Sequence, residues 1–273
     1  MPQLFYGHVS NNNVRINYYR TGGHKPPVIL LHGVTDNALC WNQVPMVLEV
    51  EYDMVMLDAR GHGSSGLDAQ GASPEVQASD VAVVIEALQL HKPILVGHSM
   101  GALAAALVAA RRPRLIRAVV LEDPPWRELG GGNGGGRNPK EIEDWRASLA
   151  RMKEQPLDEI IASVRRNNPH WDESEFFQWA KAKQQVKLAA LDWLEQPWQP
   201  WQEIVRQISC PGLLITGDSQ LGAAITPEVA RQVQKLWRKV RVVHIPGAGH
   251  NIHREQFPAY MRELARFLKH PGR

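Results

Sequence analysis

The stretch 95-LVGHSMGALAAALVAARR-112 sets one serine, Ser99, between two glycines, directly after an apolar run. The run is typical of a buried strand, and the alanine-rich residues that follow are typical of a helix. Ser99 would then lie on a tight strand-to-helix turn, with its hydroxyl above the sheet and open to a base. Side chains at Gly97 and Gly101 would collide with neighbouring elements on such a turn. Ser99 could instead only cap the helix N-terminus, but the strand before it favours a nucleophile.

Short apolar runs recur along the rest of the chain. Runs without polar alternation predict parallel strands that helices cover on both faces. They occupy residues 28–32, 53–58, 93–97, 117–121, 212–217 and 240–245. Helical periods separate them, as at Val81, Val84, Ile85 and Leu88. The sequence therefore predicts an α/β fold with right-handed crossovers, and residues 14–22, which alternate more, are a candidate antiparallel strand at one edge.

The strand–helix alternation stops between about residues 124 and 209. Helical patches follow there, and this region holds seven of the nine tryptophans: Trp126, Trp145, Trp171, Trp179, Trp193, Trp198 and Trp201. We interpret residues 126–205 as a helical cap insertion into a core formed by residues 1–125 and 206–273. Most of the tryptophans are expected to form the insertion's own core, and one to three to face a pocket. The glycine run 130–136 is expected to be a hinge or a loop without fixed structure.

Composition and charge narrow the function classes. The chain is 44% hydrophobic and 22% charged, with a formal net charge of +3 and no Lys/Arg-rich run, so neither nucleic acid nor a membrane surface is an expected partner. Cys40 and Cys210 lie far apart, which is typical of reduced thiols, and no secretory signal is visible. We therefore expect a cytoplasmic protein. The sequence gives no basis for an oligomeric state.

Two classes of cofactor site have no sequence support. The histidines lack HExxH or His/Cys ligand spacing, so we expect no metal centre. No G-x-G-x-x-G pattern follows a strand, so we expect no dinucleotide cofactor.

The segment 28-VILLHGVTDNALCW-41 supplies a second candidate part of an active site. A strand here runs into His-Gly and a polar loop, and a chain leaving a strand can aim a backbone N–H at a substrate oxygen. The N–H of Val34 and that of Met100, next to Ser99, are the candidate oxyanion donors, each worth about 3 kcal/mol in the transition state. His32 is expected to be a scaffold for this loop.

The general base is expected near the C-terminus. The segment 240-VRVVHIPGAGHNIHREQF-257 reads as a strand, a turn and then a helix, and His250 follows the turn. His250 is the candidate base, and His253, three residues later, is the alternative. His98, beside Ser99, is expected to shape the turn with its side chain pointing away from that of Ser99.

A carboxylate is needed to fix the imidazole tautomer and to stabilise the imidazolium. Asp218, in 213-LLITGDSQLGAAITPE-228, stands at the end of the strand before the histidine-bearing one and is the favoured candidate. Glu122 and Asp123, in 119-VVLEDPPW-126, lie one strand earlier and are the alternatives. Asp218 could also be a turn residue that caps backbone N–H groups.

Together these residues resemble the α/β-hydrolase superfamily. The resemblance rests on 32-HGVTDN-37, 58-DARGHGSSG-66, 97-GHSMG-101 and 247-GAGHNIHREQ-256, in the family's order. It implies a mostly parallel eight-stranded sheet with helices on both faces, and a structural role for Asp58 and Arg60. Many relatives read G-x-x-D at the acid loop, whereas this chain has Gln220 at the last position.

The resemblance also implies a reaction class, because a serine at this turn, in place of an aspartate, points to acyl transfer. We expect a cofactor-free serine hydrolase for an apolar carboxylic ester or related acyl compound, with a small apolar or aromatic substrate. The alternatives within the fold are carbon–carbon hydrolysis and cofactor-free lyase or haloperoxidase-like chemistry. A ligand receptor with very slow turnover is the non-enzymatic alternative.

Overall fold

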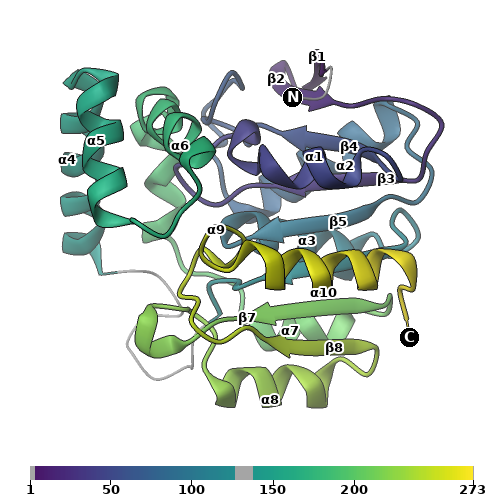
Figure 1. Ribbon diagram of the computed structural model, residues 1–273. Helices are drawn as coiled ribbons and strands as arrows, with labels where there is room; N and C mark the ends of the chain where they lie inside the picture. The colour runs from purple at the N-terminus through teal and green to yellow at the C-terminus, as the bar shows by residue number, and fades with distance from the viewer. Residues whose placement is uncertain (1–3, 127–137, 273) are drawn as a thin grey trace.

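One mixed sheet forms the centre of the molecule. A computed structural model describes residues 4–126 and 138–272. Within these ranges eight strands follow the order β1-β2-β4-β3-β5-β6-β7-β8 (Figure 1). Strand β2 pairs antiparallel with β1 and β4, and all other neighbours are parallel. The bounds are β1 Phe5–Asn11, β2 Val14–Arg20, β3 Pro27–Leu31, β4 Asp53–Leu57, β5 Ile94–His98, β6 Ala118–Glu122, β7 Gly212–Thr216 and β8 Val240–His244. The predicted eight-stranded, mostly parallel α/β-hydrolase sheet is confirmed.

Helices cover both faces of this sheet, because successive strand residues point to opposite sides. In β3, Ile29 and Leu31 join one core cluster, and Val28 and Leu30 join the other. The first cluster packs under α2 Pro74–Ala87, α3 Met100–Arg111, α7 Trp201–Gln207 and α8 Pro227–Leu236. The second packs under α1 Gln43–Leu48 and α10 Phe257–Lys269. Shorter elements are η1 Ala38–Trp41, η3 Ser219–Leu221 and α9 Ile252–Glu255.

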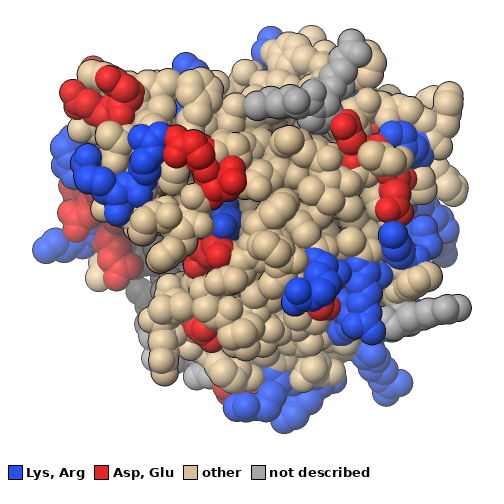
Figure 2. All heavy atoms as spheres, in the orientation of Figure 1, with Lys and Arg blue, Asp and Glu red and all other residues tan. Residues whose placement is uncertain are grey.

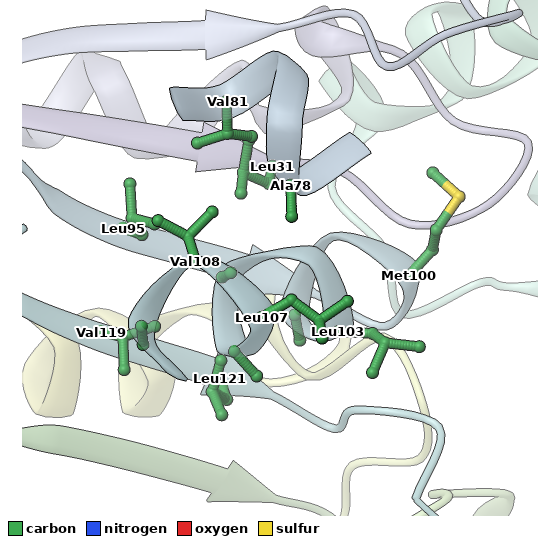
Figure 3. Packing of buried hydrophobic residues seen from close by; sticks show 14 of the residues in the cluster. Leu31, Ala78, Val81, Leu95, Met100, Leu103, Leu107, Val108, Val119 and Leu121 are labelled. Carbon is green, nitrogen blue, oxygen red and sulfur yellow. The ribbon is translucent and has the colours of Figure 1, made fainter. Parts of the chain in front are cut away.

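Helix α3 lies close to the sheet in the middle of the first cluster. Figure 3 shows Leu103 and Leu107 of α3 packed near Leu121 of β6, with Leu95 of β5 on the same side. The helix also buries Ala102, Ala105, Ala106 and Ala109, whose small side chains allow this close approach. The alanine-rich sequence after Ser99 therefore fixes the turn on which Ser99 lies.

The insertion differs in detail from the expected helices. Within the described chain it holds α4 Pro139–Glu154, α5 Leu157–Asn167, α6 Glu173–Gln185 and the 3-10 helix η2 Leu188–Glu195. We call these four elements the insertion. The predicted helical region is broken after Gln185, where α6 ends, and α7 packs against α3 with the sheet's own helices. The glycine run 130–136 lies outside the described residues.

The insertion lies to one side of the sheet in Figure 1, and Figure 2 shows acidic and basic side chains interspersed over α4 and α5. The seven tryptophans between residues 126 and 201 are not all in one place. Trp126 stacks on Trp201 in the main core, at 5.6 Å between ring centroids, whereas Trp171 belongs to a small separate cluster with Phe176. No helix in the described ranges is long and apolar enough to cross a bilayer.

Candidate active site

Ser99 lies on a strained turn between β5 and α3. Its φ of 51° and ψ of −114° are sparsely populated for a non-glycine residue, and such backbone costs about 1–3 kcal/mol. A Cβ added to Gly97 would overlap the backbone of Gly101, and one added to Gly101 would overlap the backbone of Leu31. The two glycines therefore allow α3 to start against β3 and β5, as expected from the sequence.

Three side chains from distant parts of the chain form a hydrogen-bond chain at this turn. Ser99 Oγ lies 3.0 Å from His250 Nε2, and His250 Nδ1 lies 2.6 Å from Asp123 Oδ2. The Asp123 side chain is fully buried, whereas that of His250 is 34% exposed. With Nδ1–H donating to the carboxylate, Nε2 is free to accept a proton from Ser99. The structure thus brings together the predicted serine and histidine.

The expectation that Asp218 orients His250 is wrong. Asp218 Oδ2 accepts from the Gly247 N–H at 2.7 Å, and Oδ1 lies 2.9 Å from His244 Nε2. Asp218 therefore ties the turn after β8 to the end of β7, which is close to the alternative reading of Asp218 as a turn residue. Its place beside the imidazole is taken by Asp123, directly after β6.

The loop after β7 supplies backbone donors where a carboxylate was expected. Asp123 accepts from the N–H of Ala224 at 2.7 Å and from that of Ile225 at 3.0 Å. These bonds and the one to His250 hold a fully buried carboxylate, which is costly to bury without such partners. The longer loop at this position, with Gln220 in place of an acid, is the sequence signal that could have favoured Asp123.

The other alternative residues, Glu122 and His253, pair with each other. His253 Nδ1 lies 2.8 Å from Glu122 Oε1, and the His253 N–H donates to the same oxygen at 2.9 Å. Glu122 ends β6, so its side chain and that of Asp123 serve different histidines. His98 Nε2 lies 2.9 Å from the His250 carbonyl oxygen, so His98 braces the loop of the candidate base.

The Val34 N–H lies in a turn that suits an oxyanion donor. The Asp36 N–H donates to the Gly33 carbonyl at 3.2 Å, and Thr35 has a φ of 68°, which is the pattern of a type II turn with Val34 as its second residue. Within the described residues, the N–H groups of Val34 and Met100 have no hydrogen-bond partner. Both are therefore available to a ligand.

The predicted scaffold residues lie around this turn. His32 Nε2 accepts from the Ala59 N–H at 3.0 Å. Asp58 accepts from the Ala38 N–H at 2.8 Å, and Arg60 pairs with Asp80 at 2.6 Å, both buried. These contacts confirm the structural roles expected of His32, Asp58 and Arg60.

Two hollows meet at Ser99 and His250. One has a volume of about 300 Å³ and is lined by Val34, Leu149 and Met152 together with Trp145 and Trp179. Its polar lining includes Ser148, Lys183 and Asn251. The other, of about 720 Å³, is more open and lies beside Pro125, Ala223, Ala224, Pro227 and Arg231. Two of the tryptophans of the insertion region thus line a hollow at the candidate site.

Buried neutral histidines predict how stability depends on pH. Burial lowers the pKa of His62, His98 and His253 to about 3 each, whereas an unfolded histidine titrates near 6.5. Below about pH 6.5 the unfolded chain therefore binds more protons than the folded chain. Each of these histidines then lowers the free energy of unfolding by up to about 1.4 kcal/mol for each unit that the pH falls.

We expect the thermal unfolding midpoint to fall steadily from pH 7 to pH 5. Glu122, whose pKa burial raises, acts in the opposite direction, and the three histidines outweigh it. A midpoint that stays constant or rises over this range contradicts the assignment of three buried neutral imidazoles.

No group of three or more histidine, cysteine or carboxylate side chains is arranged as metal ligands among residues 4–126 and 138–272.

Comparison with known proteins identifies the family. Residues 28–264 match the model of the alpha/beta hydrolase family, so the chain belongs to this family of hydrolases. It is 28% identical over 272 residues to an N-formylmaleamate deformylase of Pseudomonas putida, with 97% of each chain covered. The crystal structure of E-2-(acetamidomethylene)succinate hydrolase superposes with a TM-score of 0.79 at 20% identity, covering 98% of this chain and all of the other. The esterase RhEst1 of Rhodococcus superposes at 0.78 and 23% identity, covering both chains fully. These structures share the fold.

Proposed function

We propose that this hydrolase cleaves a carboxylic ester through an acyl-enzyme formed on Ser99. The observation that carries the proposal is the continuous hydrogen-bond chain from Ser99 through His250 to Asp123, on a strained turn beside two unused N–H groups. A serine hydroxyl is a poor nucleophile unless a base takes its proton and donors stabilise the oxyanion. Both conditions can be met here.

The steps follow from the positions of these groups. Ser99 Oγ attacks the carbonyl carbon while His250 Nε2 takes the serine proton, and Asp123 stabilises the imidazolium. The N–H groups of Val34 and Met100 bind the oxyanion. When the intermediate collapses, His250 gives the proton to the leaving alcohol oxygen. Water then attacks the acyl carbon while His250 takes a proton from the water. His250 returns this proton to Ser99 Oγ as the acid is released.

The hollow of about 300 Å³ supports a small substrate with an apolar part. Val34, Leu149 and Met152 with two tryptophans offer the apolar surface that excludes water from such a group. We propose that the insertion acts as a cap over this hollow, since Trp145, Leu149, Met152 and Trp179 all come from it.

An N-acyl amide is a second candidate substrate class. The observation that favours it is the 28% identity with the N-formylmaleamate deformylase over 97% of both chains. The same residues would serve, except that His250 would protonate a leaving nitrogen.

A fluorophosphonate tests the proposed nucleophile directly. Ser99 Oγ should bond to phosphorus as fluoride leaves, so the intact mass rises by that of the reagent less HF, and peptide mapping should locate the label at Ser99. Prior heating to unfold the protein serves as the control, because labelling depends on the folded site. Label at another residue, or none, contradicts the acyl-enzyme proposal.

A substrate panel separates the two candidate classes. Turnover of p-nitrophenyl acetate and butyrate supports an esterase, and release of formate from N-formylmaleamate supports an amide hydrolase. Tight ligand binding with a thermal shift but negligible turnover would favour a receptor.

A further inference from the structure

Four buried charged side chains lie between the insertion and the sheet, outside the Ser99–His250–Asp123 chain. They are Asp36, from the loop after β3, Glu175 and Lys183, both on α6, and Arg254, on α9. Each is at most 5% exposed. Two cations face two carboxylates, so the cluster is neutral as a whole. Removing one member would leave a buried charge without its partner.

The two cations bind different oxygens of the Asp36 carboxylate. Lys183 Nζ lies 2.8 Å from Oδ1, and Arg254 Nη2 lies 2.9 Å from Oδ2. Burial alone would raise the pKa of Asp36, but Arg254 and Lys183 together hold this pKa well below its usual value. Asp36 is therefore held as an anion by a cation from α6 of the insertion and by a second cation from α9, which follows His250.

Lys183 also contacts the backbone of the turn that carries the Val34 N–H. Its ammonium donates to the Thr35 carbonyl at 3.0 Å. Thr35 has positive φ, which is strained for a β-branched residue and persists only when the surroundings fix it. The two bonds from Lys183, to Thr35 and to Asp36, fix two successive residues of the turn directly after Val34.

The same cluster extends to the candidate base. Arg254 donates through Nη1 to Asn251 Oδ1 at 3.0 Å and through Nε to Glu175 Oε2 at 3.0 Å. Asn251 directly follows His250. The cluster thus connects α6 with both loops on which the proposed reaction depends, although no member belongs to the Ser99–His250–Asp123 chain.

We propose that Lys183 is a positioning residue that fixes the Gly33–Asp36 turn and so the direction of the Val34 N–H toward the oxyanion. The proposal rests on the serine-hydrolase function proposed above. Two other roles are possible for this side chain: it could bind the substrate directly, since it lines the 300 Å³ hollow, or it could only hold α6 on the core.

Lys183→Met is the first test, because methionine keeps the apolar stem and removes the ammonium. A misdirected oxyanion donor should lower kcat on a p-nitrophenyl ester by about 10- to 100-fold and leave KM within about twofold. Lys181→Met is the matched control, since Lys181 is exposed on the same helix, and it should leave both constants unchanged. A raised KM with unchanged kcat would assign Lys183 to substrate binding and overturn the proposal.

Val34→Pro provides a second variant that acts through the same N–H. Proline is favoured at the second residue of a type II turn, so this change deletes the donor and keeps the turn. If Lys183 acts through Val34, Lys183→Met should lower kcat by less than about threefold in the Val34→Pro background. If the loss of kcat in the double variant equals the product of the two single losses, Lys183 does not act through the Val34 N–H and the proposal is overturned.

Hydrogen exchange gives a readout that does not need turnover. In Lys183→Met, the peptide containing residues 33–36 should exchange faster than in the wild type, and the peptides of β5 and β6 should be unchanged. If the wild-type protein lacks ester turnover and Ser99 labelling, the proposed function fails. If the wild-type protein shows ester turnover and Ser99 labelling, but Lys183→Met has the same kcat and the same hydrogen exchange as the wild type, only the proposed role of Lys183 is wrong.

Discussion

Asp123→Asn is expected to lower kcat about 10⁴-fold, because an asparagine cannot fix the tautomer of His250 or stabilise its positive charge. The N–H groups of Ala224 and Ile225 bind different carboxylate oxygens, so the single amide oxygen of the variant keeps one of these bonds and some loss of stability is expected. The measurement is the kcat for a p-nitrophenyl ester, together with the thermal unfolding midpoint of the variant.

Asp218→Asn is the matched control for this substitution. Asp218 contacts Gly247 and His244 and not His250, so we expect kcat within about threefold of the wild-type value, with at most a modest loss of stability. If Asp218→Asn loses activity as Asp123→Asn should, while the Asp123 variant remains active, the acid assignment drawn from the geometry is wrong.

The sequence predicted the sheet well because strands β3 to β7 are buried on both faces and so have continuous apolar runs. Six apolar runs correspond to β3 through β8. The alternating segment at residues 14–22 corresponds to β2, which pairs antiparallel as expected but lies one strand in from the edge that was predicted for it. Strand β1, Phe5–Asn11, was not predicted. It lies at the sheet edge with Phe5 and Tyr6 exposed and polar residues between apolar ones, so no continuous apolar run marks it.

The acid could not be assigned from sequence because its partners are set by the path of a loop. Glu122 and Asp123 are adjacent, and no pattern tells which of them faces His250 and which faces His253. The choice depends on the backbone at Asp123, where φ is 41°, and on two N–H groups a hundred residues away. Strand order favoured Asp218, after β7, whereas the carboxylate beside His250 follows β6, one strand earlier.

The buried charge cluster shows the same limit. Asp36 and Lys183 are separated by 147 positions, and no pattern in the sequence of α6 marks Lys183 as a buried charge. Only the packing of α6 against the loop after β3 brings the two together. Sequence patterns located Ser99 and His250 on the turns of the candidate site, whereas the residues that hold those turns required the structure.

Ser99→Ala is expected to have the largest effect, lowering kcat about 10⁶-fold. The variant lacks the nucleophile but keeps the N–H groups of Val34 and Met100, so a residual rate above that in water should remain. Relief of the strained serine turn is not expected, because alanine at φ 51° is equally disfavoured. The measurement is single-turnover and steady-state hydrolysis of the p-nitrophenyl ester. Mass spectrometry should first show that the variant contains no wild-type protein.

His250→Ala then separates an acyl-enzyme from proton-transfer chemistry without a covalent intermediate. If Ser99 is the nucleophile and His250 its base, the two act as a unit, and the double variant should be no slower than Ser99→Ala alone. If the reaction instead needs only a base, as in the lyase-like alternative, His250→Ala should lose far more activity than Ser99→Ala. Since the 3.0 Å contact between Ser99 Oγ and His250 Nε2 fits either role, the relative losses decide between them.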